Sequence, residues 1–150
     1  MGQCGSGMHE IIPGLWLGDA DTADNYKLLL SKNIRFVVNI SGEKYSKNEN
    51  IQYMNLKVAD TPTANLKRFF FKTSDFIDQG LHQNKAVFVH CLMGVSRSSS
   101  IVIAYLMIHR NMSFQTALEL VRSKRSCVQP NPGFVKQLLQ LETFLKQRNN

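Results

Sequence analysis

One segment of the chain is apolar on nearly every side: SSSIVIAYLMIHR, residues 98–110. A helix with no polar face has to be buried all round, so other elements must enclose this one. The apolar segment AVFV, residues 86–89, precedes it and is typical of a short buried strand. We therefore expect a strand that leads through a short loop into a helix at the centre of a domain.

The rest of the chain alternates between strand and helix patterns. Further strands are expected within residues 9–19, 34–40 and 51–58, and further helices around residues 23–30, 66–77, 114–121 and 134–145. The resulting order is strand, helix, strand, strand, helix, strand, and then a run of helices. This order predicts a single-domain α/β fold with a central, mostly parallel sheet flanked by helices. We expect the domain to cover residues 9–150, after a flexible segment at residues 1–8.

The 150 residues carry a formal net charge of +7, which favours anionic partners such as phosphorylated proteins or anionic lipid. Nucleic acid is disfavoured, because no basic segment is interleaved with stacking aromatic side chains. The sequence has no apolar run long enough to span a bilayer, and no apolar core of a secretory signal near the N-terminus. We therefore expect a cytoplasmic protein, with the nucleus as a second compartment.

The loop between the strand and the central helix has a composition suited to binding phosphate: CLMGVSR, residues 91–97. In α/β sheets, ligands bind beyond the carboxyl ends of the strands. Backbone amides and a helix N-terminus can surround an anion there, and the arginine fork can bind two phosphate oxygens. A cysteine at the rim is stabilised as a thiolate, which is a nucleophile. The candidate phosphate-binding residues are Leu92, Met93, Gly94, Val95, Ser96 and Arg97.

The pattern His90-Cys91-x5-Arg97-Ser98 resembles the signature of cysteine-dependent protein tyrosine phosphatases. The surrounding chain is most similar to the small, atypical dual-specificity phosphatases, and the similarity covers nearly all of the chain. The stretches that carry it are IIPGLWLGD, VADTPTANL, VHCLMGVSRSSSIVIAYLM and SFQTALELVRSKRSCVQPNPGFVKQL. The resemblance implies a protein tyrosine phosphatase-like fold. It also implies hydrolysis of phosphotyrosine and of phosphoserine or phosphothreonine through a phosphocysteine intermediate.

The resemblance also implies roles for individual residues. Cys91 is the expected nucleophile, and Arg97 is expected to bind the phosphate and the transition state. Asp60 is the expected general acid and base, because it follows a predicted strand and precedes Thr61 and Pro62 in a loop at the same edge of the sheet. The other aspartates lack this context.

Three further residues have both a structural and a functional interpretation. Ser98 is either a helix cap or the hydroxyl that assists breakdown of the phosphocysteine. His90 is either a packing residue or one that orders the loop and the thiolate. Asn131 is either the cap of the last helix, since Pro132 follows it, or a support for the phosphate loop.

No metal or cofactor is expected, because the arginine, the helix end and the amides supply the positive charge that a metal ion would otherwise give. The expected partners are phosphorylated proteins, with kinases among them. Arg122, Lys124 and Arg125 are candidates for meeting acidic or doubly phosphorylated substrate segments, or else form a solvated face. The sequence does not indicate an oligomeric state.

The first residues of the chain, MGQCGS, fit the N-myristoylation pattern with Gly2 as the acceptor. Cys4 could carry a second acyl chain, and two chains are needed for stable anchoring. This interpretation predicts membrane association, and the alternative is an unmodified flexible tail.

Two other functions stay open at this point. One is hydrolysis of a non-protein phosphate, such as a phosphoinositide, a sugar phosphate or RNA. The absence of a basic residue between Cys91 and Arg97 argues against lipid. The other is a phosphoprotein-binding scaffold, although such proteins typically lose the nucleophile that this chain retains.

Overall fold

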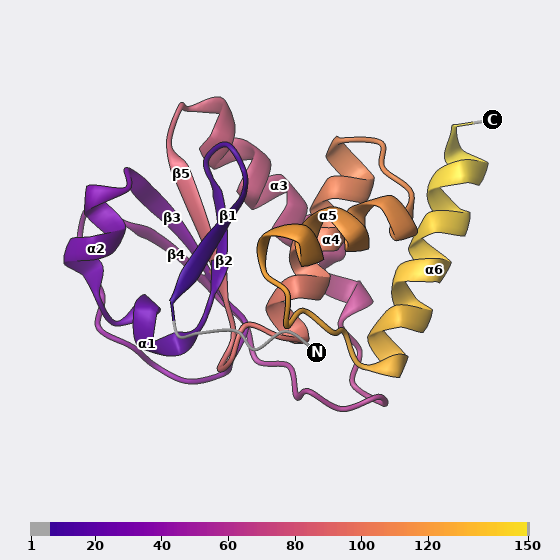
Figure 1. The fold of residues 1–150 in the computed structure, drawn as a ribbon, viewed down its shortest axis with the longest axis horizontal. Coiled ribbons are helices and arrows are strands. Elements are labelled where there is room, and N and C mark those ends of the chain that lie inside the picture. Colours follow the sequence, from indigo (N-terminus) through magenta and orange to yellow (C-terminus); the bar gives the residue numbers. More distant parts are fainter. Residues whose placement is uncertain (1–6, 150) are drawn as a thin grey trace.

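The structure is a computed structural model that describes residues 7–149. A five-stranded sheet lies at its centre, with the strand order β1-β2-β5-β3-β4 (Figure 1). The strands are β1 Met8–Ile12, β2 Leu15–Gly18, β3 Ile34–Asn39, β4 Gln52–Asn55 and β5 Ala86–His90. β1 pairs antiparallel with β2, and all other pairs are parallel. The predicted α/β fold with a mostly parallel sheet is confirmed.

The single strand expected within residues 9–19 is in fact a hairpin of β1 and β2. Pro13 and Gly14 form the turn, and Gly14 has a φ of +86°, which glycine adopts without the steric penalty of a side chain. β1 lies at one edge of the sheet and pairs with one neighbouring strand, β2. Met8 already belongs to this strand, while the predicted lipidation sites Gly2 and Cys4 lie outside the described residues.

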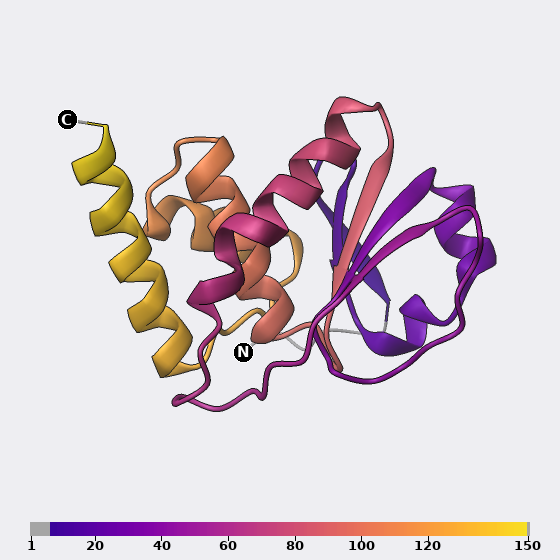
Figure 2. The same cartoon turned by 180° about the vertical axis from the view of Figure 1, so that it is seen from behind.

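Helices cover both faces of the sheet (Figures 1 and 2). One face carries the short helices α1 Ala20–Ala23 and α2 Tyr26–Ser31, over a small apolar core. The other face carries η1 Lys67–Phe69, α3 Phe70–His82, α4 Arg97–His109, α5 Phe114–Lys124 and α6 Pro132–Arg148. Over residues 7–149, no helix combines the length and the apolarity that crossing a membrane requires.

Helix α4 is enclosed as the sequence predicts. Every residue from Ser98 to Met107 is buried, and the helix packs against α3, α5, α6 and strand β5. The small side chains at its start leave room for the preceding loop. The hydroxyls of Ser99 and Ser100 donate to the carbonyls of residues 95 and 96, so these polar groups are satisfied inside the core.

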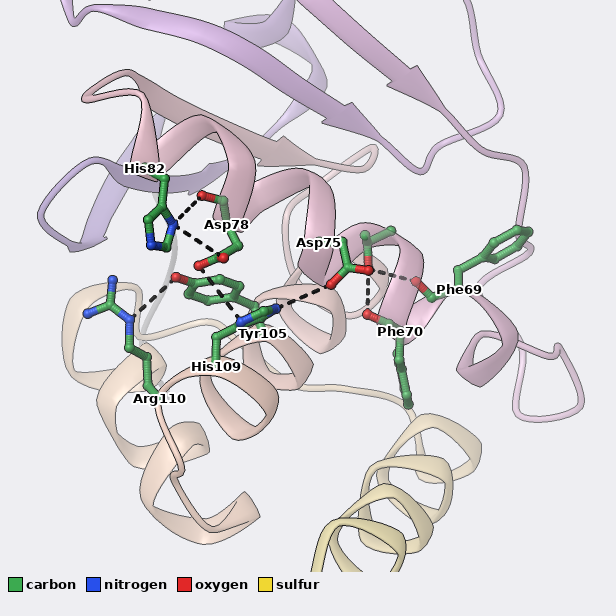
Figure 3. A network of polar contacts seen from close by, with 9 residues as sticks. Phe69, Phe70, Asp75, Asp78, His82, Tyr105, His109 and Arg110 are labelled. Atoms are coloured by element: carbon green, nitrogen blue, oxygen red, sulfur yellow. Dashed lines mark hydrogen bonds and ion pairs between the residues drawn. The ribbon is translucent and has the colours of Figure 1, made fainter. Parts of the chain in front are cut away.

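A polar network joins the C-terminal end of α4 to α3 (Figure 3). The ring of His109 stacks on buried Tyr105, with centroids 5.3 Å apart. Its two nitrogens lie 3.5 Å from a carboxyl oxygen of Asp75 and 3.7 Å from one of Asp78. Burial raises the pKa of Tyr105, and Arg110 Nε donates to its oxygen at 3.4 Å. This end of α4 is therefore fixed far from the loop at its N-terminus.

Gly80 of α3 allows that helix to approach the sheet closely, and this close packing can be tested by adding a side chain at residue 80. A Cβ at this position would lie 2.7 Å from Cγ2 of Val87 and 2.9 Å from the ring of Phe36. Such overpacking costs about 1–3 kcal/mol, whereas replacing a helical glycine by alanine gains at most about 1 kcal/mol. We expect Gly80→Ala to lower the free energy of unfolding by about 1 kcal/mol in urea denaturation. The exposed change Lys72→Ala on the same helix is the control, and an increase in stability for Gly80→Ala would contradict the packing.

Candidate functional site

The candidate site lies where strand β5 passes into helix α4, at the carboxyl edge of the sheet. His90 is the last residue of β5, Cys91 follows it, and Ser96 is the N-cap residue of α4. Cys91 is 3% exposed and is a free cysteine. The strand thus delivers the sulfur to the base of a six-residue loop, residues 91–96, here called the phosphate loop.

The sulfur of Cys91 has two polar neighbours. The backbone N–H of Gly94 donates to Sγ at 3.3 Å, and the hydroxyl of Ser98 lies 3.1 Å from it. Both groups can donate to a sulfur, and such bonds are strongest when the acceptor is charged. Ser98 therefore does not act as a helix cap here, because its hydroxyl is turned toward the sulfur.

Three consecutive carbonyl groups of the phosphate loop, those of residues 93–95, point away from its centre. Arg125 donates to the first from Nη2 at 2.9 Å and to the second from Nε at 3.0 Å, and Gln129 N donates to the third at 2.8 Å. A trans peptide unit holds its C=O and N–H on opposite sides. The following N–H groups are therefore turned toward the inside of the loop, as the bond from Gly94 to Cys91 shows.

Arg125 was not predicted as part of the site, because its segment has the pattern of a charged surface. It is 1% exposed, so it cannot meet a substrate segment, and that interpretation is wrong for this residue. Its Nη1 also contacts Nδ1 of His9 at 3.0 Å, which ties the loop to strand β1. Burial lowers the pKa of Arg125, and the negative charges of Asp19 and Cys91 oppose this effect.

Arg97 begins α4 and reaches across to the loops that follow β3 and β4. Its Nη1 donates to the carbonyl of Ser41 at 3.3 Å and to that of Val58 at 3.1 Å. Its Nε is buried and has no partner among the described residues. A buried N–H without a partner costs about 1–3 kcal/mol, so the guanidinium is held on one side and is short of an acceptor on the other.

Asn131 connects the phosphate loop to the loop that carries Asp60. Its side-chain nitrogen donates to a carboxyl oxygen of Asp60 at 2.9 Å, and its backbone N–H donates to the hydroxyl of Ser96 at 2.9 Å. Its side-chain oxygen accepts from Phe134 N and caps α6. Asn131 thus has both of the roles that the sequence left open. Nearby, a Cβ on Gly133 would lie 1.9 Å from the carbonyl oxygen of Pro62, so these two loops are in close contact.

His90 supports the loop as a neutral side chain. Burial lowers its pKa to about 4, against the raising effects of its bond to Cys91 and of Asp19. Its Nδ1 lies 3.1 Å from the Cys91 carbonyl, and its ring stacks on Phe88 and meets Tyr45 edge-on. The ring therefore orders the backbone at Cys91 without adding a positive charge beside the sulfur.

The arrangement suits in-line attack by a sulfur on a bound oxyanion. A nucleophile lies at the base of a ring of inward N–H groups, an arginine with an unsatisfied N–H borders it, and a carboxyl group is held nearby on an opposing loop. Leu92 and Met93 are 55% and 68% exposed and form the outer rim.

Comparison with known proteins agrees with this geometry. The family model of the dual specificity phosphatase catalytic domain matches residues 15–144. Human dual specificity protein phosphatase 9 is 39% identical over 140 residues, which are 91% of this chain and 36% of that protein. Mouse dual specificity protein phosphatase 22 is 38% identical over 138 residues, covering 92% of this chain and 75% of that protein.

Solved structures show the same fold. The crystal structure of human DUSP28 is similar with a TM-score of 0.89 at 29% sequence identity, over 93% of this chain and 95% of that chain. The range matched by the catalytic domain model includes both the phosphate loop and the loop that carries Asp60. The chain therefore belongs to the dual specificity phosphatase family and is a cysteine-dependent protein phosphatase.

Proposed function

We propose that Cys91, Arg97 and Asp60 together hydrolyse phosphate monoesters of protein side chains through a phosphocysteine. The observation that carries this proposal is the state of Arg97. Two backbone carbonyls fix one side of its guanidinium, while its buried Nε has no partner within residues 7–149. A phosphate in the loop would supply the missing acceptor, and planar arginine binds phosphate through two parallel bonds.

In the first step, the Cys91 thiolate attacks phosphorus while the bond from phosphorus to the substrate oxygen breaks. The inward N–H groups of the loop and Arg97 bind the three equatorial oxygens, where charge develops in the transition state. Asp60 donates its proton to the departing oxygen. The products of this step are the dephosphorylated side chain and a phosphocysteine, with Asp60 left as a carboxylate.

In the second step, water attacks phosphorus and gives a proton to the Asp60 carboxylate, while the bond from phosphorus to sulfur breaks. Inorganic phosphate leaves, and the thiolate and the acid form of Asp60 are restored. Ser98, 3.1 Å from the sulfur, is placed to donate to the departing thiolate. The bonds from Asn131 to Asp60 and to Ser96 support the assignment of both proton transfers to Asp60, because they tie the carboxyl group to the phosphate loop.

The rim of the site favours a protein substrate over a lipid headgroup. The two exposed side chains of the phosphate loop are apolar, Leu92 and Met93, and the loop has no basic residue between Cys91 and Arg97. A peptide offers apolar side chains on either side of the phosphorylated residue, whereas an inositol headgroup offers further charge. Phosphoinositide, sugar and RNA phosphates are therefore the second candidates.

Several expectations from the sequence stay predictions. They are kinases among the phosphorylated substrates, acylation at Gly2 and Cys4 with membrane association, and location in the cytoplasm or nucleus. Of the flexible segment expected at residues 1–8, Met8 lies in strand β1, and the expectation stays a prediction for residues 1–6. A scaffold function is disfavoured by the intact set of nucleophile, arginine and acid.

The primary test is phosphate release from phosphotyrosine and phosphothreonine peptides in reducing buffer with EDTA. We expect the wild type to release phosphate. Cys91→Ser should fall to background, because the serine hydroxyl stays protonated at neutral pH and is a weak nucleophile. Circular dichroism would show that the variant is folded. Equal release by Cys91→Ser would refute the mechanism, and binding without release by the wild type would support the scaffold.

The proton transfer assigned to Asp60 predicts a dependence on the leaving group. General acid catalysis contributes roughly 10²–10⁴-fold, so Asp60→Asn should lower kcat/KM, which reports the first step alone, by that factor on phosphopeptides. The loss should be much smaller on para-nitrophenyl phosphate, whose leaving group needs no proton. Asn131→Ala should show the same pattern more weakly, since it only frees the carboxyl group. An equal loss on both substrates would assign Asp60 a structural role.

The bonds from Arg125 to the phosphate loop predict that it positions the loop amides. Misplacing catalytic groups by about 1 Å can cost roughly 10²-fold, so we expect Arg125→Met to lower kcat by about that factor. Iodoacetate should then alkylate Cys91 more slowly at neutral pH, since fewer amides face the sulfur. Arg125→Lys should recover only part of both effects, because lysine cannot reach two carbonyls with a planar fork. Unchanged alkylation and kcat in a folded Arg125→Met protein would contradict this assignment.

A further inference from the structure

A second pocket, of about 340 Å³, lies behind the phosphate loop. Its floor includes His90 and Asn39, which are 1% and 3% exposed. Its rim carries Lys44, Lys47 and Lys57. Cys91 and Val89 belong to the core on the α4 face of the sheet, whereas Phe88 belongs to the core on the α1 face. Because side chains alternate along a strand, His90 faces the second pocket and Cys91 faces the catalytic loop.

The wall of this pocket, residues 41–48, is held in place by polar bonds. The Asn39 side chain donates to the carbonyl of Glu43 at 2.7 Å and to the Asn55 side chain at 3.1 Å. The N–H of residue 46 donates to Asp24 at 3.1 Å, and the N–H of residue 48 donates to the hydroxyl of Tyr53 at 3.0 Å. The segment is thus a folded wall around a preformed space.

The charge of the pocket is positive. Three lysines line it, and Glu43 is the carboxylate among its lining residues. Asp24 adjoins the wall, where its carboxylate accepts from the backbone of residue 46. This bond lowers its pKa and keeps it ionised, so Asp24 is a second negative charge near the pocket. The three lysines outnumber these two carboxylates, so an anionic group in the pocket would gain net attraction.

The His90 ring adds a specific requirement to this pocket. A carbonyl oxygen only accepts, so the bond from Nδ1 to the Cys91 carbonyl places the ring proton on Nδ1. Burial holds the pKa of His90 near 4, so at neutral pH Nε2 has a free lone pair. Among the described residues, this nitrogen has no hydrogen-bond donor. The pocket therefore offers cationic groups at its rim and one acceptor at its floor.

A phosphate monoester meets both requirements. Its charged oxygens can pair with lysines, and its monoanion, which is abundant near its second pKa of about 6, retains one O–H to donate to Nε2. A carboxylate offers no donor, and a neutral hydroxyl offers no charge. We propose that this pocket binds the phosphate of a second phosphorylated side chain on the protein substrate, an inference that rests on the proposed function.

The position of the pocket fits a ligand shared with the catalytic loop. Gly42 and Lys57 line the pocket, and they adjoin the two residues whose carbonyls hold Arg97, Ser41 and Val58. The same two loops therefore border both phosphate sites. A peptide that enters the catalytic loop could pass over this border and place a nearby phosphorylated residue in the second pocket.

Binding can be tested without catalysis by titrating the Cys91→Ser protein with N-acetyl phosphoserine amide and recording backbone amide NMR spectra. We expect two groups of shifts, one at residues 92–97 and one at residues 42–47 and 55–57. The second group of shifts should disappear when the three changes Lys44→Gln, Lys47→Gln and Lys57→Gln are added to the Cys91→Ser protein. It should persist in the charge-matched control Lys72→Gln, Lys136→Gln, Lys146→Gln, whose three lysines are exposed.

The outcomes separate the two proposals. Shifts at residues 92–97 alone would overturn the second pocket and leave the proposed function intact. Shifts at residues 42–47 alone would support the pocket and count against the catalytic loop. A parallel titration with inositol 1-phosphate distinguishes the source, because tighter binding of that compound in the pocket would overturn the assignment to a protein side chain.

Kinetics supply the functional readout. We expect a second phosphoserine near the phosphotyrosine of a peptide to raise kcat/KM of the wild type about tenfold, the order expected of one or two charge-assisted hydrogen bonds. The lysine triple variant should lose this ratio and the charge-matched control should keep it. The ratio is kcat/KM of the doubly phosphorylated peptide divided by that of the singly phosphorylated peptide. An equal ratio in both variants would mean that the gain comes from the net charge of the protein, and it would refute a specific pocket.

Discussion

The site depends on one set of hydrogen bonds, those that buried Arg125 makes to the carbonyls of residues 93 and 94. A loop of six residues has as many acceptors as donors, and an anion is bound only if the acceptors are turned outward. Arg125 provides an external partner for two of them, and the planarity of the peptide unit then directs the following N–H groups inward. The cost of burying a guanidinium is offset by four groups that accept from it, the carbonyls of residues 7, 93 and 94 and Nδ1 of His9, and by nearby negative charge such as that of Asp19.

The parallel sheet explains why distant segments meet at this loop. The carboxyl ends of β3, β4 and β5 lie at one edge, so the loops after β3 and β4 face the loop after β5. Arg97 exploits this by donating to carbonyls from the first two loops, and Asn131 adds the start of α6 through its bond to Asp60. Each contact joins residues far apart in sequence, which makes the geometry of the site a property of the whole fold.

This origin also explains what could be predicted from the sequence. The apolar helix α4 and the placement of Cys91 and Arg97 follow from local patterns, because strand, loop and helix are contiguous. Arg125 could not be recognised, since a buried arginine and a surface arginine look the same in a basic segment, and only the carbonyls 31 residues away distinguish them. The neutral state of His90 likewise depends on burial by elements that its neighbours in sequence do not reveal.

Strand β5 ends at His90, and the next residue, Cys91, faces the opposite side of the sheet. His90 bonds through Nδ1 to the carbonyl of Cys91, so the backbone at the nucleophile and the floor of the second pocket share one ring. A donor that engages Nε2 would polarise the ring and strengthen the bond from Nδ1. That bond fixes the backbone from which the sulfur projects. Occupation of the second pocket would therefore act on the orientation of Cys91 as well as on the affinity for substrate, through a path of two covalently adjacent residues.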